Sequence, residues 1–409
     1  MLMLVLSTVT WRSASIYGGG LDVIVAAKAA LALLALALAW AVRINTSAPR
    51  PMGTTFVWLL IAYVTVSSFG AWTADELAVS GVLSVRLLLV AAGVILLVKT
   101  FPAEQLMRDL MASMTVVALV AAVTGVPSYL ADGRLSGGVP GMHSNELSLL
   151  CALTAIGGIY LVLTNQARPR HILILGALLI ALVGTGSRTA LLTVVLAALV
   201  MLPQTRKLNP FVSIVLLACI PVTLFVMLGT GAFESFFTRE GEGDVSTLNS
   251  RSIVWSAALD YPPTEWVRWL GNGLATKELP VQGQYWDTQV LDSSWVSALV
   301  QAGWVGVLIL LGWVTTAAAM TFRMARGPRM LTQALLVALI SRSVVESGLM
   351  DSSPAFLTFA LIAFIADRGP AEPRFPRRAG EPAYPSRGRP ATGLSPAQVG
   401  RTASTRVPI

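Results

Sequence analysis

The chain has 409 residues, of which 55% are hydrophobic and only 12% charged, and its mean hydropathy is +0.71. This composition excludes an ordinary soluble globular protein and indicates a polytopic membrane protein. The net charge of +8 does not indicate nucleic-acid binding, because the tail 368–409 alone has eight arginines against two glutamates and so carries +6.

Eleven segments of the chain are apolar over roughly the length that crosses a bilayer, which is about twenty residues for a helix. We therefore predict an all-α, polytopic transmembrane bundle of 11–12 helices. The apolar segment at the very start is too short to span alone and lacks the features of a signal peptide, so a twelfth helix stays open. The windows are 21–42, 54–72, 78–98, 106–126, 145–164, 171–185, 187–203, 210–232, 293–318, 331–348 and 354–367.

Basic residues occur in alternate connections between these windows, which places those connections and the basic tail on the cytoplasmic side. The one long connection then lies outside the cell. The tail is rich in Pro, Gly and Arg without apolar periodicity, so we predict that it is disordered, either touching anionic lipid or fully solvated. The predicted parts are a short apolar segment 1–20, transmembrane helices 21–232, an external loop with short helices 233–291, transmembrane helices 292–367 and the tail 368–409.

Polar residues on the predicted external side are the candidate functional residues. Both cysteines, Cys151 and Cys219, lie inside apolar windows and predict neither a disulfide framework nor a metal site. Four arginines are expected at similar depth at one membrane face, where ionisable groups are functional candidates by default. The candidates are Arg134, His143 and Asn145 before the fifth window, Arg188 in the turn "GTGSRTALL", Arg251 ahead of Trp255, Asp292 and Ser293 in "LDSSWVSALVQAGWVG", and Arg342 with Glu346 four residues later.

Each candidate also has a purely structural interpretation. His143 and Asn145 are suited to cap the following helix, and Asp292 is suited to be the N-cap of the helix that begins at "DSSW". Arg188 is placed to reach lipid phosphate, and the pair Arg342 and Glu346 is placed to join helices internally.

The arginines favour a phosphate-containing substrate, because a guanidinium binds two oxygens at once and stays charged. A lipid-borne pyrophosphate at the outer leaflet fits such a cluster. Arginines that stabilise the charge of a leaving pyrophosphate make a metal unnecessary, and the external segments hold no Asp-x-Asp pair. Transfer to a hydroxyl also needs a base, for which a carboxylate or an imidazole is suited.

These residues resemble the O-antigen ligase and polymerase superfamily. The resemblance covers about residues 130–350 and rests on the "TGSRTALL" turn, the long external loop with Arg251 and Trp255, and the start of the next helix. The ligases there carry His, a small polar residue, nine residues and Gly-x-x-Gly. This chain has Asp292, Ser293, nine residues and then Gly303-Trp-Val-Gly306, with Asp in place of His.

The resemblance implies a C-type glycosyltransferase fold in a bacterial plasma membrane, with its active site facing outside. It implies transfer of a glycan from a polyprenyl diphosphate donor to a hydroxyl of a glycan, lipid or protein acceptor, without cofactor or metal. Asp292 takes the base position and Arg188 and Arg251 the arginine positions; Arg134, His143, Asn145, Ser293, Arg342 and Glu346 are expected to bind substrate. An exposed Asp is a weaker base than His, so Asp292 needs a partly desolvated pocket.

Other functions stay open from the sequence. Aspartate at the base position also occurs in relatives that look like polysaccharide polymerases, so ligase and polymerase are not distinguished. A transporter or lipid flippase would also have many helices and buried charges, although no internal repeat is visible. A membrane scaffold without catalysis would leave the clustering of Arg, His and carboxylate unexplained. Membrane lipids are expected partners, and nucleic acid is not.

Overall fold

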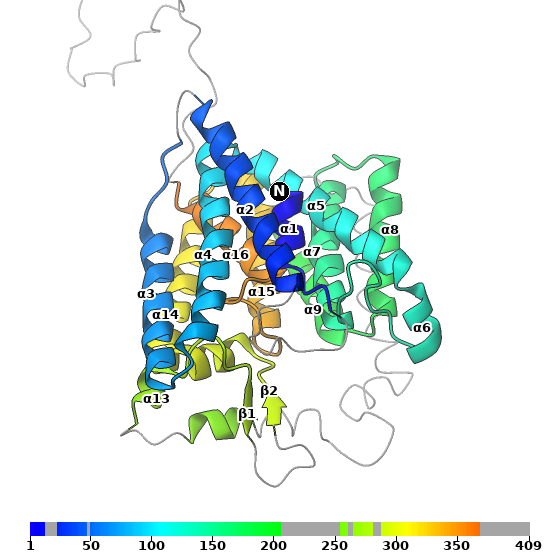
Figure 1. Cartoon of the computed structure of the whole chain (residues 1–409). Coiled ribbons are helices and arrows are strands. Elements are labelled where there is room, and N and C mark those ends of the chain that lie inside the picture. The colour runs from blue at the N-terminus through cyan, green and yellow to red at the C-terminus, as the bar shows by residue number, and fades with distance from the viewer. Residues whose placement is uncertain (13–22, 47–49, 206–253, 261–264, 281–287, 369–409) are drawn as a thin grey trace, which may run out of the picture. The chain divides into compact units, whose positions relative to one another are not determined.

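The computed structural model describes the chain except for residues 13–22, 47–49, 206–253, 261–264, 281–287 and 369–409. Residues 1–370 form one compact unit, and residues 371–409, a second unit, lie outside the described part. In its described residues, the first unit is a bundle of helices with a small two-stranded sheet (Figure 1). A polytopic helical membrane protein, as predicted from the apolar windows, is therefore confirmed.

Six helices in the described part of the chain are long and apolar enough to cross a membrane. Each coincides with a predicted window to within a few residues, because about twenty apolar residues both form a helix and match the bilayer. They are α2 (Val23–Ile44), α3 (Thr55–Thr73), α4 (Leu77–Thr100), α5 (Ala103–Thr124), α7 (Ser144–Leu163) and α14 (Ser294–Thr321).

Four shorter helices of the described residues also belong to the bundle. α8 (Pro169–Gly184), α9 (Arg188–Met201) with the 3-10 turn Leu202–Gln204, and α16 (Pro354–Ala366) are apolar. α15 (Arg326–Ser343) packs mainly against α9 and starts and ends earlier than its predicted window. The predicted helix 210–232 lies outside the described residues.

Helix α16 lies at the centre of the core, and all 13 of its residues are buried. Its Phe359 ring lies 5.6 Å from the ring of Trp313 on α14, which in turn lies 5.8 Å from Phe56 on α3. Such large aromatic side chains bury much apolar area and fix how neighbouring helices meet.

The described part of the N-terminal segment contains the short helix α1 (Leu2–Thr8), which packs against α2 and α5. Its seven residues extend about 10 Å, far less than a bilayer. This helix therefore supplies a buried piece of the bundle and is not by itself a further span.

The two ends of the bundle differ in character. At one end, here called the basic end (43–46, 50, 99–102, 165–170 and 322–329), the backbone N–H of Arg50 donates to Lys99 O at 3.0 Å. Arg368 Nη2 donates to Phe101 O there at 2.8 Å.

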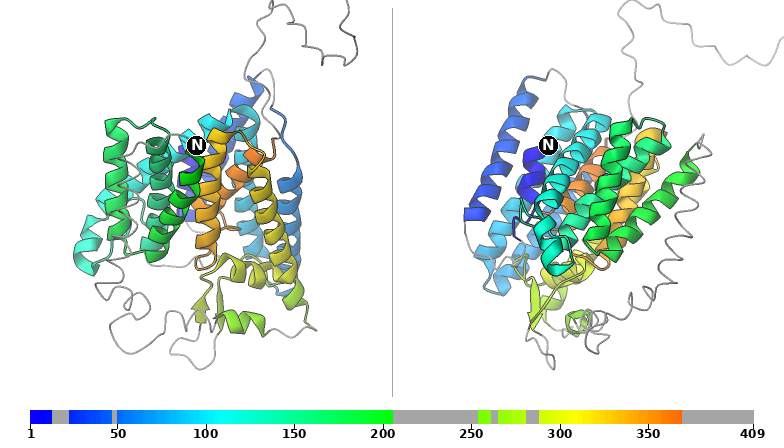
Figure 2. Two further views of the ribbon diagram at one scale, coloured as in Figure 1. Left: turned by 180° about the vertical axis from the view of Figure 1, so that it is seen from behind. Right: turned by 90° about the vertical axis from the view of Figure 1, so that its right-hand side faces the viewer.

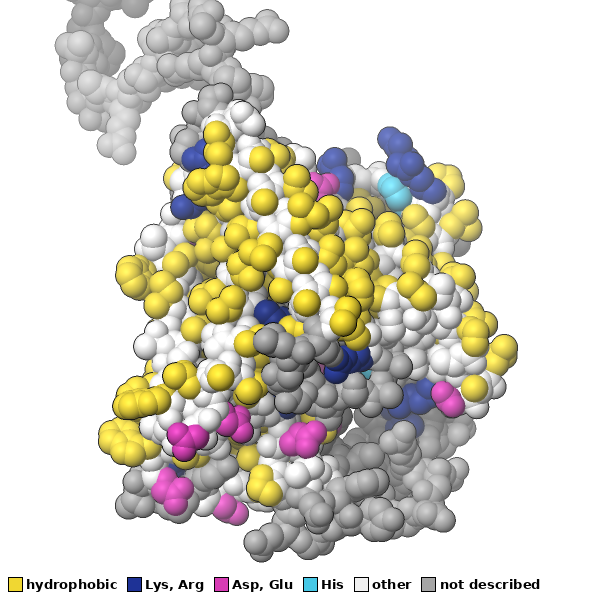
Figure 3. Space-filling view, in the orientation of Figure 1, with side chains coloured by type: hydrophobic (Ala, Val, Ile, Leu, Met, Phe, Trp, Pro, Cys, Tyr) yellow, Lys and Arg dark blue, Asp and Glu magenta, His cyan; other side chains and the backbone are white. Residues whose placement is uncertain are grey.

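Hydrophobic side chains cover the middle of the face in Figure 3, and acidic side chains gather at its lower edge.

The opposite end, here called the cavity end (125–143, 185–187, 271–280, 288–293 and 344–353), holds the small elements. They are α6 (Val126–Asp132), α13 (Trp266–Leu270) and the antiparallel strands β1 (Glu278–Pro280) and β2 (Thr288–Val290), with Leu279 opposite Gln289. All views place α13 and the strands beside the start of α14 (Figures 1 and 2). The described parts of the long loop thus cover this end of the bundle.

Helix α14 is broken at Gly303, whose φ of 63° and ψ of −165° are not helical. A Cβ at this position would lie 2.1 Å from the backbone carbon of Trp269 in α13. Glycine is required here because it alone lacks a Cβ and readily adopts positive φ. The break therefore allows α13 to pack directly against α14, and it divides α14 into a first part near the cavity and a second part in the bundle.

Candidate active site

A cavity of about 740 Å³ lies at the cavity end, bordered by the N-terminal segment, α2, α4, the start of α7 and the segments before α14 and α16. Its lining combines apolar residues with many ionisable ones, as expected for a site that binds a polar group inside a membrane protein. The charged lining residues are Arg12, Lys28, Arg86, Glu146, Lys277, Asp292, Arg342, Glu346 and Asp351.

His143 lines the cavity and is the N-cap residue of α7, as the structural interpretation predicted. Its Nδ1 accepts a hydrogen bond from the Asn145 N–H at 3.3 Å. Burial lowers the pKa of His143 below its usual value, nearby Arg134 lowers it further, and Asp292 opposes both. The ring is therefore neutral near pH 7 and carries its proton on Nε2, so it is suited to donate a hydrogen bond rather than to act as base.

Asp292 lines the same cavity and is half-buried, directly after the buried Leu291. Helix α14 begins at Ser294 with Ser293 as its N-cap residue, so the alternative in which Asp292 is the cap is wrong by one position. Asp292 is instead close enough to His143 to affect its charge. Asp292 is thus partly buried, which is the condition that the sequence analysis set for a carboxylate at this position.

Ser293 itself is buried and does not line the cavity. Its hydroxyl donates to the carbonyl oxygen of Ser343 at 3.4 Å, and the neighbouring Trp295 Nε1 donates to Ser343 Oγ at 3.0 Å. These contacts join the start of α14 to the end of α15. Ser293 therefore has a structural role in this arrangement, although we expected it to bind substrate.

Arg342 and Glu346 both line the cavity and form an ion pair at 3.7 Å. Helix α15 ends at Ser343, so Glu346 lies in the following turn and not, as expected, on the same helix. Arg342 Nη2 also donates to Asn145 O at 2.9 Å, and Glu346 O accepts from Ser294 Oγ at 3.0 Å. The pair thus connects α7, α14 and α15 beside the cavity.

The other predicted arginines differ in position. Arg134 Nε donates to Thr185 O at 3.3 Å, which places Arg134 against the Gly-rich turn that precedes Arg188. Arg188 is the first residue of α9, with Ser187 as N-cap, and is not among the lining residues of the cavity. Arg251 lies outside the described residues. Of the three predicted arginines that the structure describes, Arg342 lines the cavity, whereas Arg134 and Arg188 do not. Arg134 is close enough to His143 to affect its charge.

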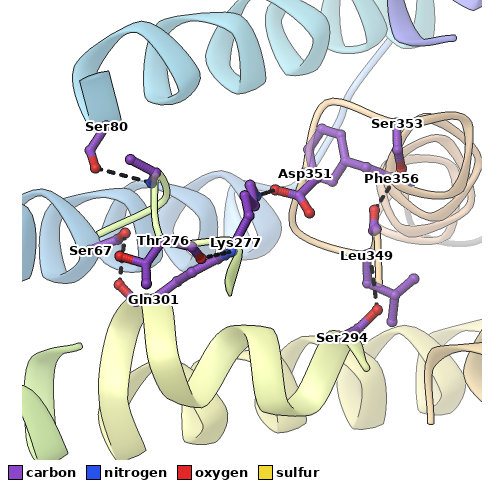
Figure 4. A network of polar contacts seen from close by, with 12 residues as sticks. Ser67, Ser80, Thr276, Lys277, Ser294, Gln301, Leu349, Asp351, Ser353 and Phe356 are labelled. Carbon is purple, nitrogen blue, oxygen red and sulfur yellow. Dashed lines mark hydrogen bonds and ion pairs between the residues drawn. The ribbon is translucent and has the colours of Figure 1, made fainter. Parts of the chain in front are cut away.

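A network of polar contacts supports one side of the cavity (Figure 4). Lys277 Nζ pairs with the Asp351 carboxylate, and the neighbouring Ala275 N–H donates to Ser80 Oγ at 3.1 Å. Gln301 Nε2 donates to Thr276 O at 3.2 Å. These contacts attach the segment before β1 to α4, to α14 and to the loop before α16.

Residues 171–311 match the family model described as O-Antigen ligase. The chain is similar to the O-antigen ligases. This confirms the resemblance inferred from the sequence, and the matched segment contains Arg188, Arg251, Asp292 and Gly303. No curated protein matches the chain.

Much of the cavity of this O-antigen ligase-like protein lies outside the matched segment. Lys28 of α2 and Arg86 of α4 line it, together with Arg12 of the N-terminal segment and Glu146 of α7. We did not predict Lys28 and Arg86 as site residues. The signal was present, because each is a charge inside an apolar window, where ionisable residues are costly and usually functional.

The described residues contain no group of three or more His, Cys, Asp or Glu that could hold a metal ion. The polar side chains that line the described part of the site include those of arginine, lysine, histidine, aspartate and glutamate. These groups can bind anionic oxygens, donate hydrogen bonds and accept a proton.

Proposed function

We propose that this O-antigen ligase-like membrane protein transfers a glycan from a polyprenyl diphosphate donor to an acceptor hydroxyl at the outer face of the plasma membrane. The observation that supports it most is the position of Asp292, a half-buried carboxylate that lines a cavity with cationic and anionic side chains at one end of an apolar bundle. A membrane-anchored donor needs its diphosphate bound at the edge of the bilayer, and a cavity of this kind is suited to that.

In this proposal Asp292 accepts the proton of the acceptor hydroxyl while that oxygen bonds to the anomeric carbon of the donor sugar. The bond between that carbon and the diphosphate oxygen breaks, and its electron pair leaves with the diphosphate. Arg188 and Arg251 stabilise the resulting charge, as the family resemblance implies. In the same proposal His143 and Arg342, which line the cavity, orient the polar groups of the substrates.

A polysaccharide polymerase is the second candidate, favoured by the aspartate at position 292 where the ligases have histidine. The two reactions share the donor and the base and differ in the acceptor. A transporter or lipid flippase would move the donor without breaking its glycosidic bond.

The protein reconstituted in nanodiscs with a polyprenyl diphosphate glycan tests these functions. A ligase consumes the donor only when a separate acceptor is added, whereas a polymerase forms longer lipid-linked glycans from the donor alone. Intact donor in every reaction would contradict both enzymatic proposals and favour transport.

Substitution of Asp292 tests the proposed base. Asp292→Asn keeps the size of the side chain but cannot accept a proton, so we expect the rate to fall on the order of a hundredfold or more. Asp292→His should retain part of the activity and shift its pH dependence towards neutrality. An Asn variant as active as the wild type, at equal thermal stability, would mean that Asp292 is not the base.

Sidedness is tested by cysteine labelling in intact cells after Cys151 and Cys219 are replaced by alanine. Glu76 at the cavity end and Gln166 at the basic end are both exposed, so each is a suitable position for a single cysteine. An impermeant maleimide should label the cysteine at 76 and leave the one at 166 unlabelled. Labelling at 166 alone would place the cavity in the cytoplasm.

A further inference from the structure

Asp292 follows directly on the small β1–β2 sheet. In that sheet Glu278 lies opposite Val290. The Leu291 N–H donates to Lys277 O at 3.0 Å, which continues the antiparallel pairing by one residue. Asp292 is thus the first residue after this bond. Because side chains alternate between the two faces of a strand, a shift of one residue in the pairing would turn Asp292 to the opposite face.

The β1–β2 sheet depends on support from the rest of the fold. Each strand is three residues long, and an isolated two-stranded ribbon is only marginally stable. The segment before β1 gives part of this support. The Gly273 N–H donates to Gln301 O at 3.0 Å, and Gln301 Nε2 donates to Thr276 O at 3.2 Å. Residues 272–277, here called the first anchor, are thereby attached to α14.

The turn between α15 and α16, residues 344–353, is here called the second anchor, and it holds the start of α14. The Ser294 N–H and hydroxyl both donate to Glu346 O, at 3.2 and 3.0 Å. The Leu349 N–H donates to Ser294 Oγ at 3.3 Å (Figure 4). The second anchor is itself fixed, because it ends at Ser353, the N-cap residue of the fully buried helix α16.

The ion pair of Lys277 with Asp351 joins the two anchors directly (Figure 4). Both side chains line the cavity, and 21% and 29% of their surface is exposed. Such a pair contributes little to stability, because the cost of removing two charges from water offsets much of their attraction. Its position between the anchors suggests another role, since the anchors hold the backbone on both sides of Asp292.

We propose that Lys277 and Asp351 are a positioning pair, which keeps the Asp292 carboxylate directed at the cavity by fixing the two anchors between which it lies. This inference rests on the proposed function, in which Asp292 is the base. Lys277 lies inside the segment 171–311 that matches the family, and Asp351 lies outside it. Loss of the pair would let the carboxylate move, and a displacement of about 1 Å can lower a rate on the order of a hundredfold.

Hydrogen exchange of the Leu291 N–H tests the positioning without any turnover. It is followed by mass spectrometry of the full-length protein in nanodiscs, with fragmentation that resolves this amide. In Lys277→Gln and in Asp351→Asn it should exchange at least about tenfold faster than in the wild type, because its bond to Lys277 O opens more often. Unchanged exchange in both variants would overturn the inference.

The matched control is Lys99→Gln at the basic end. Lys99 is also half-buried, and its carbonyl oxygen likewise accepts a backbone N–H, from Arg50. This variant should leave exchange at Leu291 and turnover as in the wild type. Faster exchange at Leu291 in the control as well would show a general effect of losing a lysine and overturn the inference.

Turnover tests whether the pair acts through Asp292. Lys277→Gln should lower kcat about tenfold or more and leave both KM values unchanged. Lys277→Arg keeps an ion pair and should retain most of the rate. In the Asp292→Asn background, Lys277→Gln should cause no further loss, because no base is left to position.

Two outcomes of these kinetics contradict the positioning pair. An equal loss of kcat with and without Asp292→Asn would show that Lys277 acts elsewhere. A raised KM at unchanged kcat would assign Lys277 to substrate binding. Thermal unfolding of each variant checks the fold, and Lys277→Met replaces Lys277→Gln if the latter does not fold.

The exchange measurement also separates this inference from the proposed function. If Asp292→Asn turns over like the wild type while exchange at Leu291 still depends on the pair, Asp292 is not the base and the pair still positions this segment. If Asp292→Asn is inactive while exchange is unchanged in both pair variants, the base assignment stands and the positioning pair is wrong.

Discussion

The same two helices carry positive charge at both ends of the bundle, but in opposite environments. At the basic end, Arg43 and Lys99 lie in the last turns of α2 and α4, where the helix dipole favours cations. Both side chains are partly exposed there. At the cavity end, Lys28 and Arg86 face a cavity among apolar helices, and Lys28 is only 7% exposed.

The difference shows which charges serve the fold and which need another explanation. A cation at a helix C-terminus stabilises the helix by itself, typically by about 0.3–1 kcal/mol. A cation buried among apolar side chains costs free energy unless it is paired or bound to a ligand. Cations buried among apolar side chains occur at the cavity end, and this is where we place the chemistry.

The largest expected effect concerns the helix break that separates the cavity end from the rest of α14. Gly303→Ala places a Cβ 2.1 Å from the backbone carbon of Trp269 and at a positive φ, so we expect loss of most folded protein on expression. Gly312→Ala in the same helix meets nothing within 4 Å and should stabilise the helix slightly, by up to about 1 kcal/mol. Size-exclusion chromatography and SDS titration of both variants measure the contrast. Normal folding of Gly303→Ala would mean that α13 does not pack against this position.

An intermediate effect is expected from the buried ion pair at the cavity end. Arg342→Met leaves the Glu346 carboxylate without the guanidinium and removes the bond to Asn145 O, so unfolding should become easier by about 3 kcal/mol. The double variant Arg342→Met/Glu346→Gln should recover part of this loss. Arg43→Met at the basic end is the control and should change stability by less than about 1 kcal/mol. Equal losses at the two ends would remove the distinction drawn between them.

The smallest expected effect is a pH dependence at the cavity end. Burial holds the pKa of His143 below its usual value, so the unfolded chain takes up a proton at higher pH than the folded protein does. Stability from the neutral ring is therefore present above about pH 6.5 and is lost as the pH falls through the folded pKa. His143→Asn keeps a capping side chain and should lose less thermal stability than the wild type between about pH 7.5 and pH 5.5. Parallel pH profiles would show that His143 does not contribute.

The helices were predictable because length and apolar content are local properties of the sequence. The windows for α2, α4 and α7 needed no knowledge of tertiary structure. The break at Gly303 was not predictable, because it depends on the close approach of α13, which the sequence alone does not show.

The candidate site was partly predictable because polar residues at the ends of apolar windows are also a local property of the sequence. His143, Asn145, Asp292, Arg342 and Glu346 lie at the ends of apolar windows, where polar residues stand out, and all five line the cavity. Lys28 and Arg86 were missed although each is a charge inside an apolar window, because the sequence does not show that the packing of α2 against α4 brings both to this cavity.

The break in α14 also has a consequence for the lipid environment. The part after Gly303, residues 304–321, extends about 27 Å if helical, which is close to the hydrocarbon thickness of a bilayer, about 30 Å. The part before it contains the buried polar residues Ser294, Ser297 and Gln301. The part of α14 whose length matches the hydrocarbon thickness is therefore separate from the part that borders the cavity. We therefore expect the second part to accommodate changes in bilayer thickness by tilting, with little effect on the surroundings of Asp292.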